Sequence, residues 1–392
     1  SMMYIRQVQI LVQAQICTWL IVYTKRQERF PRKGSCLLHR KGEKQMQPLE
    51  LYIHIPFCVK KCAYCDFLSG PAGEKEKEEY VKMLVDEIRN CPDTVQNYRV
   101  ISIFFGGGTP SLLTGEQIGR LMDTVREIFT LDEDAEITME MNPGTVTEEK
   151  LRKYRQAGVN RLSIGLQSVN DEELRLLGRI HTYEEFREAY HLARANGFSN
   201  INVDLISAIP GQTVESWRRT LEQVMALSPE HISSYSLIIE EGTPFYEKYR
   251  ENPPVDEDTD RQMYDLTKEI LGRHGYHRYE ISNYAKEGQE CIHNLKYWQG
   301  GDYLGLGLGA ASCMEHERWS NARGLTDYED RICRGQKPVE QTEELGEEEQ
   351  KAEFMFLGLR CMEGVSAEQF EKKFHQSVEE RYGKVLHKYE NM

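Results

Sequence analysis

Long hydrophobic runs are missing from this sequence. The most nearly continuous apolar stretch of its N-terminal part extends only from Ile16 to Tyr23, whereas a membrane-spanning helix needs about 20 predominantly apolar residues. No small-residue cleavage site follows this stretch, which argues against a secretory signal peptide. We therefore expect a cytoplasmic protein. At 392 residues, we expect one barrel-sized domain accompanied by a smaller one.

A surplus of positive charge is also missing. The chain carries 49 Lys and Arg against 63 Asp and Glu, a formal charge of −14. This balance argues against nucleic acid as a partner, because nucleic-acid binding needs a basic face. Residues 1–45 differ from the rest: they contain nine Lys or Arg and two Glu, hence +7, which leaves −21 for the remainder. We interpret residues 1–45 as a basic, poorly ordered N-terminal extension; the alternative is an amphipathic segment that touches the inner face of a membrane.

Cysteine is scarce as well, with ten residues that are too few and too dispersed for a disulfide scaffold. The one tight cluster is C-x3-C-x2-C, formed by Cys58, Cys62 and Cys65. Three thiolates can hold three irons of a [4Fe–4S] cluster and leave the fourth iron open to another ligand. A structural zinc site, which usually has four protein ligands, and three thiols without a metal are the alternatives.

Short β-branched runs alternate with amphipathic helical patterns from Leu51 onward, which is typical of βα units around a parallel sheet. Strands are predicted over residues 51–55, 100–105, 136–141, 161–164, 200–206 and 231–237. Helices are predicted over residues 79–91, 115–129, 147–157, 183–196 and 214–227. This rhythm predicts an α/β fold, a partial (β/α)6 barrel rather than a closed eight-stranded one.

Unusual residues fall at or near the predicted carboxyl ends of these strands, where barrels of this type collect their chemistry. The cysteine cluster follows the first strand and the stretch GGGTPS follows the second; Glu140 closes the third, Gln167 follows the fourth and Asp204 lies within the fifth. A triple glycine lets the backbone approach a charged ligand closely. Carboxylate and amide side chains can bind ribose hydroxyls or an ammonium group, and Arg179 can pair with a carboxylate. Taken singly, each feature has an ordinary alternative: a tight turn, a solvated side chain, a helix-end cation or, for Asp204, a hydrogen bond to a helix N-terminus.

The rim residues lie in long, distinctive phrases: HIPFCVKKCAYCDF, FFGGGTPSLL, EMNPGTVTEEKL and NRLSIGLQSVNDEELRLLGRIHT. From Leu51 to about Arg360 the chain resembles radical S-adenosylmethionine (SAM) proteins of the oxygen-independent coproporphyrinogen oxidase group. The resemblance implies a [4Fe–4S] cluster on Cys58, Cys62 and Cys65, with SAM bound to the open iron. It also implies SAM contacts from Tyr52, Tyr64, Gly107, Gly108, Thr109, Glu140, Gln167, Arg179 and Asp204.

Two features separate the branches of this group. The oxidase branch resembles C-x3-C-x2-C-x-C, whereas Phe67 stands at the last of these positions here. The segment HNLKYW is similar to an HNxxYW pattern associated with haem binding in the haem-chaperone branch. The resemblance therefore implies a chaperone that binds haem through His293, Tyr297 and Trp298 and passes it to acceptor haemoproteins, such as membrane-bound respiratory proteins. The alternatives are an oxygen-independent coproporphyrinogen III oxidase, an inactive scaffold, and a purely structural role for His293.

These expectations divide the chain into three regions. Residues 1–45 form the extension, residues 46–285 the radical SAM partial barrel, and residues 286–392 a C-terminal region with the HNxxYW segment. A charged helical pattern from Ala367 to Tyr389 ends that region. The helical C-terminal domain of the group usually runs further, so we expect a short one here.

Overall fold

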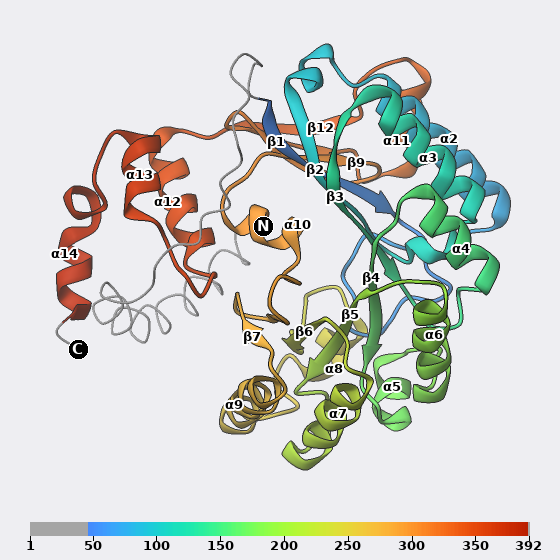
Figure 1. The fold of residues 1–392 in the computed structure, drawn as a ribbon, viewed down its shortest axis with the longest axis vertical. Coiled ribbons are helices and arrows are strands. Elements are labelled where there is room, and N and C mark those ends of the chain that lie inside the picture. Colours follow the sequence, from blue (N-terminus) through green and yellow to red (C-terminus); the bar gives the residue numbers. More distant parts are fainter. Residues whose placement is uncertain (1–45, 391–392) are drawn as a thin grey trace. The chain divides into compact units, whose positions relative to one another are not determined.

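The computed structural model describes residues 46–390. The basic extension predicted for residues 1–45 lies outside the described residues. Within them, the expected α/β architecture and partial barrel are confirmed by six parallel strands that stand side by side in sequence order (Figure 1). These strands are β1 (Gln47–Ile55), β2 (Tyr98–Gly107), β3 (Thr130–Met141), β4 (Arg161–Gln167), β5 (Asn200–Ser207) and β6 (His231–Ser236).

Helices return the chain between these strands and cover the outer face of the sheet (Figure 1). They begin with local capping signals: at α3, the Thr114 side chain accepts a hydrogen bond from the backbone N–H of Gln117, and the Gln117 side chain reaches back to Thr114. The helices of this layer are α2 (Glu74–Arg89), α3 (Gly115–Ile128), α4 (Glu148–Ala157), α5 (Asp171–Leu177), α6 (Tyr183–Ala195) and α7 (Val214–Leu227), with the 3-10 turns η1 (Asp93–Asn97) and η2 (Pro110–Leu112).

Further strands, which no sequence pattern predicted, extend both edges of the sheet. Strand β9 (Tyr303–Leu306) pairs parallel with β1, and β10 (Ala311–Met314), β11 (Glu317–Asn321) and β12 (Val339–Glu344) continue antiparallel. At the other edge, β8 (Asn283–Ala285) and β7 (His277–Arg278) follow β6. Most of these strands span five residues or fewer, too short for a period-2 pattern to be distinctive.

The remaining helices follow the sixth strand. Of these, α9 (Glu257–Arg273) is long and amphipathic. Its Met263 backbone carbonyl and Thr267 hydroxyl accept hydrogen bonds from the Trp217 indole on α7. The helices are α8 (Pro244–Tyr249), α9 (Glu257–Arg273), α10 (Ile292–Trp298), α11 (Leu325–Cys333), α12 (Glu347–Gly358), α13 (Ala367–Phe374) and α14 (Val378–Glu390). Among residues 46–390, no helix combines the length and the apolar character needed to cross a bilayer.

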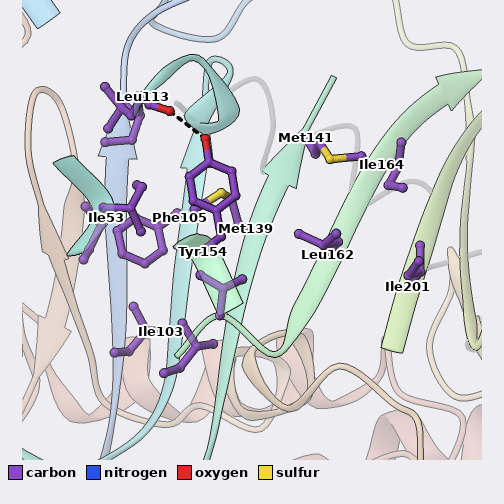
Figure 2. Packing of buried hydrophobic residues seen from close by; sticks show 14 of the residues in the cluster. Ile53, Ile103, Phe105, Leu113, Met139, Met141, Tyr154, Leu162, Ile164 and Ile201 are labelled. Atoms are coloured by element: carbon purple, nitrogen blue, oxygen red, sulfur yellow. Dashed lines mark hydrogen bonds between the residues drawn. The ribbon is translucent and has the colours of Figure 1, made fainter. Parts of the chain in front are cut away.

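The two faces of the barrel wall differ in chemistry. Residues that point outward are apolar and fully buried under the helices; Figure 2 shows Ile53, Ile103, Phe105, Met139, Leu162 and Ile164 among them, with Tyr154 donating a hydrogen bond to the Leu113 carbonyl. Replacing one such Ile with Ala lowers the free energy of unfolding by about 2–5 kcal/mol. The alternate residues point inward and are polar: Glu50, Ser102, Glu136, Ser163 and Asn202 are buried there. Because successive side chains of a strand point to opposite faces, core residues point outward and site residues point inward.

The described chain separates into two compact units. One contains residues 47–297 and 301–344; the other contains residues 298–300 and the chain from Leu345 onward. Residues 301–344 lie within the C-terminal region expected from the sequence, but they cluster with the barrel because β9 pairs with β1. The second unit has an aromatic core in which Phe370 packs against Phe354, Phe374 and Tyr382.

Candidate functional site

The cysteine loop follows β1 and is pinned by backbone hydrogen bonds on both sides. Cys58 N–H donates to the Gly70 carbonyl over 2.9 Å, and Ala63 N–H donates to the Leu177 carbonyl at the end of α5 over 2.9 Å. A turn joins Cys65 N–H to the Cys62 carbonyl over 3.3 Å. The loop therefore presents its three cysteines at the carboxyl end of β1, and all three are partly exposed.

The three thiols lie close enough to influence one another electrostatically. Burial raises the pKa of Cys65 to about 11, and the neighbouring Cys62 and Cys58 add to that rise. No three His, Cys, Asp or Glu side chains of residues 46–390 converge on a point where they could hold a single metal ion. Three thiolates on separate irons of a [4Fe–4S] cube need not converge, so the donor set fits a cube with one open iron.

A chain of side chains joins two of these cysteines. The Thr109 hydroxyl donates to Cys58 Sγ over 3.6 Å and accepts from Asn142 Nδ2 over 2.7 Å. On the other side, Arg179 donates to Asn142 Oδ1 over 2.6 Å and to Cys62 Sγ over 3.8 Å. Arg179 follows the short helix α5, but its guanidinium points into the site rather than serving as a helix-end cation. Its third contact is the Gly165 carbonyl, at 2.8 Å.

The glycine stretch lies at the end of β2, against the cysteine loop. Gly107 has φ +105°, and a Cβ there would lie 2.3 Å from the His54 ring. A Cβ on Gly108 would lie 2.6 Å from the Phe57 carbonyl oxygen. Only glycine permits this close approach. The glycines are thus required by packing within the protein, as in the tight-turn alternative, and the approach of a ligand to them stays a prediction.

Two carboxylates face the interior beside these glycines. Glu140 Oε2 accepts the Gly107 N–H over 3.1 Å, and burial, with the nearby Asp204 charge, raises the pKa of Glu140 to about 8. Asp204 accepts from Asn202 over 2.7 Å and from Ser163 over 3.0 Å. Burial likewise raises the pKa of Asp204. The partners of Asp204 are side chains of the barrel wall, not the helix N-terminus considered from the sequence.

The remaining predicted SAM contacts lie on the same rim. Gln167 ends β4 with φ +72°, a strained conformation for a non-glycine residue that is often kept at functional sites. Tyr52 lies on the inner face of β1, 3.1 Å from His54 Nδ1, and burial and the Glu140 charge raise the pKa of Tyr52. Tyr64, in the cysteine loop, packs against the cluster formed by Leu177, Ile206, Ile209 and Phe245.

The fold thus brings the cysteine loop, the glycines, Glu140, Gln167, Arg179 and Asp204 to one end of the barrel. Sequence reasoning missed Asn142, which links Thr109 to Arg179. The missed signal was alternation: Asn142 stands two residues after Glu140 and therefore faces the same side as Glu140. His54, which packs on Gly107, was missed although it stands two residues after Tyr52.

The HNxxYW segment forms the start and body of α10. His293 Nδ1 lies 3.0 Å from Ser102 Oγ, and the His293 ring stacks on Phe104 with centroids 5.1 Å apart. Burial, with the nearby Arg161 charge, lowers the pKa of His293 to about 3, so the imidazole is neutral. A neutral imidazole is the form that ligates metals.

The other two residues of this segment have different neighbours. The Tyr297 ring packs on the Tyr303 ring of β9, with centroids 5.4 Å apart. Trp298 clusters with the second unit, where the Arg360 guanidinium lies 4.2 Å above its ring. Cys291, two residues before His293, is buried, and its thiol donates a hydrogen bond to Glu136 Oε1 over 3.3 Å.

Comparison with known proteins agrees with this geometry. The Radical SAM superfamily model matches residues 52–224, and the HemN C-terminal domain model matches residues 345–392. The radical SAM domain implies a [4Fe–4S] cluster and SAM as cofactors. The structure is also similar to coproporphyrinogen III oxidase (HemN) from Escherichia coli, described as a radical SAM enzyme, with a TM-score of 0.76 and 26% identity over 86% of this chain and 81% of that chain.

Two relatives named "Heme chaperone HemW" match over much of their length. The protein from Bacillus subtilis (strain 168) is 38% identical over 86% of this chain and 89% of its own. The protein from Escherichia coli (strain K12) is 45% identical over 68% of this chain and 70% of its own. Together with the cysteine loop and the polar barrel interior, these matches show that the chain belongs to the HemW family of radical SAM proteins.

Proposed function

We propose that this protein is a haem chaperone built on a radical SAM domain, which binds haem and transfers it to acceptor haemoproteins. The observation that carries the proposal is the state of His293 on α10. Its imidazole is neutral, ordered by Ser102 and Phe104, and has no hydrogen-bond partner for Nε2 among the described residues. An imidazole nitrogen of this kind is the common protein ligand of haem iron. The relatives named as haem chaperones support the same function.

We assign the cluster to Cys58, Cys62 and Cys65, with SAM on the open iron. A cluster of this type supplies an electron to the bound SAM. The chain's own contribution is to position the cofactors. Glu140 and Asp204 would offer carboxylates to the polar groups of SAM. The backbone of Gly107 and Gly108 and the side chains of Tyr52, Tyr64, Thr109, Gln167 and Arg179 would complete the rim.

We propose that the binding sites for SAM and for haem lie on opposite sides of residue 285 in the sequence. Residues 46–285 would hold the cluster and SAM, and residues 286–392 would hold haem through His293, Tyr297 and Trp298. A thiolate-bound cluster suits a reducing compartment, so we propose a cytoplasmic protein. Membrane-bound respiratory proteins at the inner face of the membrane are the acceptors that we propose to test first.

Anaerobic reconstitution followed by haem titration, with and without SAM, tests this function. The wild-type protein is expected to shift the Soret absorbance of haem at stoichiometric addition, and His293→Ala is expected to lose that shift. His191→Ala, an exposed histidine on α6, is the matched control and should bind as the wild type does. Absence of haem binding by the wild type, or unchanged binding by His293→Ala, would contradict the proposal.

The second candidate function is coproporphyrinogen III oxidation, which the similarity to the E. coli oxidase structure favours. Phe67 speaks against it, because the oxidase pattern has a cysteine there and the Phe67 side chain is 61% exposed on the cysteine loop. Anaerobic incubation of the reconstituted protein with coproporphyrinogen III and SAM distinguishes the two. Clear turnover would replace the chaperone assignment with the oxidase.

A further inference from the structure

The end of β4 has a backbone conformation that few residues other than glycine adopt. Gln167, the last residue of the strand, is buried and has φ +72°. The register between β4 and β5 shifts between Gly165 and Gln167, which marks a β-bulge. Bulges next to binding sites re-aim side chains, and a positive φ at a non-glycine residue persists only where neighbouring contacts hold it. Contacts around Gln167 must therefore maintain this conformation.

With this backbone, the Gln167 side chain reaches back over Gly165. A Cβ on Gly165 would lie 3.0 Å from Gln167 Nε2. It would also lie 3.1 Å from both Arg179 Nη2 and Asn142 Oδ1. Three polar groups thus gather at the one residue of β4 that has no side chain. The Gln167 amide is thereby placed beside the hydrogen bond that joins Arg179 to Asn142.

The residue that follows Gln167 is fixed by two hydrogen bonds. Ser168 is fully buried, and its hydroxyl oxygen accepts the Asn170 N–H over 3.0 Å. The same hydroxyl forms a hydrogen bond of 2.6 Å with Glu173 Oε2 on α5. Ser168 is therefore attached both to its own loop and to the helix that follows, so the backbone beside Gln167 has little freedom to relax.

Glu173 extends this attachment to the loop after β5. Gln212 Nε2 donates to Glu173 Oε2 over 2.9 Å, and the Ser216 hydroxyl on α7 forms a hydrogen bond with Glu173 Oε1. Glu173, Gln212 and Ser216 are all buried. These partners and Ser168 are neutral side chains, so Glu173 acts as a centre of hydrogen bonds rather than as half of an ion pair. A satisfied buried network of this kind makes the segments that it joins rigid.

We infer that Glu173 is a positioning residue for SAM binding, because through Ser168 it holds the strained backbone of Gln167. The Gln167 amide is thereby kept beside Arg179, at the rim where the SAM contacts are proposed. The inference rests on that proposed SAM site for its consequence, whereas the contacts of Glu173 involve no ligand.

Ser168→Ala tests the attachment with the smallest change. The variant is reconstituted anaerobically as the full chain, and SAM affinity is measured by equilibrium dialysis. We expect SAM affinity to fall about 10-fold, as for the loss of one well-placed hydrogen bond to the ligand. Iron content should stay at the wild-type level, as should the electron paramagnetic resonance spectrum of the reduced cluster without SAM. Ser312→Ala, which also removes a fully buried, hydrogen-bonded serine hydroxyl, is the matched control and should bind SAM as the wild type does.

Two substitutions of Glu173 separate its hydrogen bonds from its charge. Glu173→Ala removes all three contacts and should weaken SAM binding at least as much as Ser168→Ala does. Glu173→Gln keeps an oxygen that can accept from Gln212 and an amide that can donate to the Ser216 hydroxyl oxygen. It should therefore restore SAM affinity to the wild-type value. If Glu173→Gln binds SAM as weakly as Glu173→Ala, the role of Glu173 as a hydrogen-bonding centre is refuted.

A double-mutant cycle shows whether the effect passes through Gln167. Gln167→Ala should itself weaken SAM binding, and adding Ser168→Ala should then cause no further loss, because the amide that Ser168 helps to hold is already absent. A full additional loss in the double variant would overturn the inference. Absence of SAM binding by the wild type would contradict the proposed SAM site together with this inference. Equal SAM affinity in the wild type and Ser168→Ala would contradict this inference alone.

Discussion

Arg179 donates a hydrogen bond of 2.6 Å to the side-chain oxygen of Asn142, and this contact closes a path from Cys62 to Cys58 through Thr109. Asn142 suits this place because its amide can accept from Arg179 and donate to Thr109 at once. The protein thereby gives two of the three cysteine sulfurs a side-chain hydrogen-bond donor, a hydroxyl for Cys58 and a guanidinium for Cys62.

Asn142→Asp should weaken cofactor binding although it preserves size. A carboxylate can still accept from Arg179, but it draws the Thr109 proton away from Cys58 Sγ. Asn142→Ala removes a hydrogen-bond partner from both Thr109 and Arg179. Each buried group left unsatisfied should lower the free energy of unfolding by about 1–3 kcal/mol. We expect a loss of SAM affinity of about 10-fold or more, measured by equilibrium dialysis after anaerobic reconstitution. Asn196→Ala, at the end of α6, is the control. If Asn142→Ala binds SAM as tightly as this control does, the hydrogen-bonded path through Asn142 does not contribute to SAM binding.

Each cysteine of the loop should be required for the cluster. Replacing Cys58, Cys62 or Cys65 with Ala removes one of three iron ligands, and the reconstituted protein should lose the broad visible absorbance of the cluster and most of its bound iron. Cys333→Ala, which removes an exposed cysteine on α11, should retain the wild-type iron content. A full iron complement in any of the three loop variants would mean that the assigned ligand set is incorrect.

Two Gly→Ala substitutions should have opposite effects. Gly107→Ala places a methyl group 2.3 Å from the His54 ring at φ +105°, and the strain should cost about 1–3 kcal/mol and impair SAM binding. Gly119→Ala lies within α3 and meets nothing within 4 Å. It should stabilise the protein by about 0.5–1 kcal/mol because alanine favours the helix. Thermal unfolding and SAM titration check both variants. Equal changes of the unfolding midpoint in Gly107→Ala and Gly119→Ala would contradict the steric argument.

Glu87 should make stability depend on pH. This carboxyl accepts hydrogen bonds from Tyr328, Gly307 and Asn321, and burial raises its pKa to about 7. The folded state therefore holds a proton between about pH 4.5 and 7 that the unfolded chain has released. The contribution of Glu87 to stability is thus present at low pH and is lost as the pH rises through 7.

Unfolding midpoints at pH 5, 6, 7 and 8 test this sign. Glu87→Gln lowers stability at every pH, since an amide donor replaces one acceptor oxygen, but its midpoint should fall less between pH 5 and 8 than that of the wild type. Glu79→Gln removes a more exposed glutamate of the same helix and should keep the wild-type pH dependence. A steeper fall in Glu87→Gln than in the wild type would show that the carboxyl is not protonated in the folded state.

Local sequence determined the elements of the barrel and the kind of chemistry at its rim. The alternation of β-branched residues specified six strands, the cysteine spacing specified an iron–sulfur loop, and Phe67 with HNLKYW pointed to haem handling. These features are encoded within a few neighbouring residues, where side-chain period, glycine freedom and ligand spacing act directly.

Tertiary structure alone decided which distant residues meet. Asn142 contacts Thr109 and Arg179 only because β3 ends beside both of them. His293 contacts Ser102 and Phe104 only because α10 lies against the inner face of the barrel. The short strands from β7 to β12 also form by pairing with neighbours rather than by a pattern of their own. Such contacts depend on hydrogen bonds between residues far apart in the chain, so no local sequence pattern predicts them.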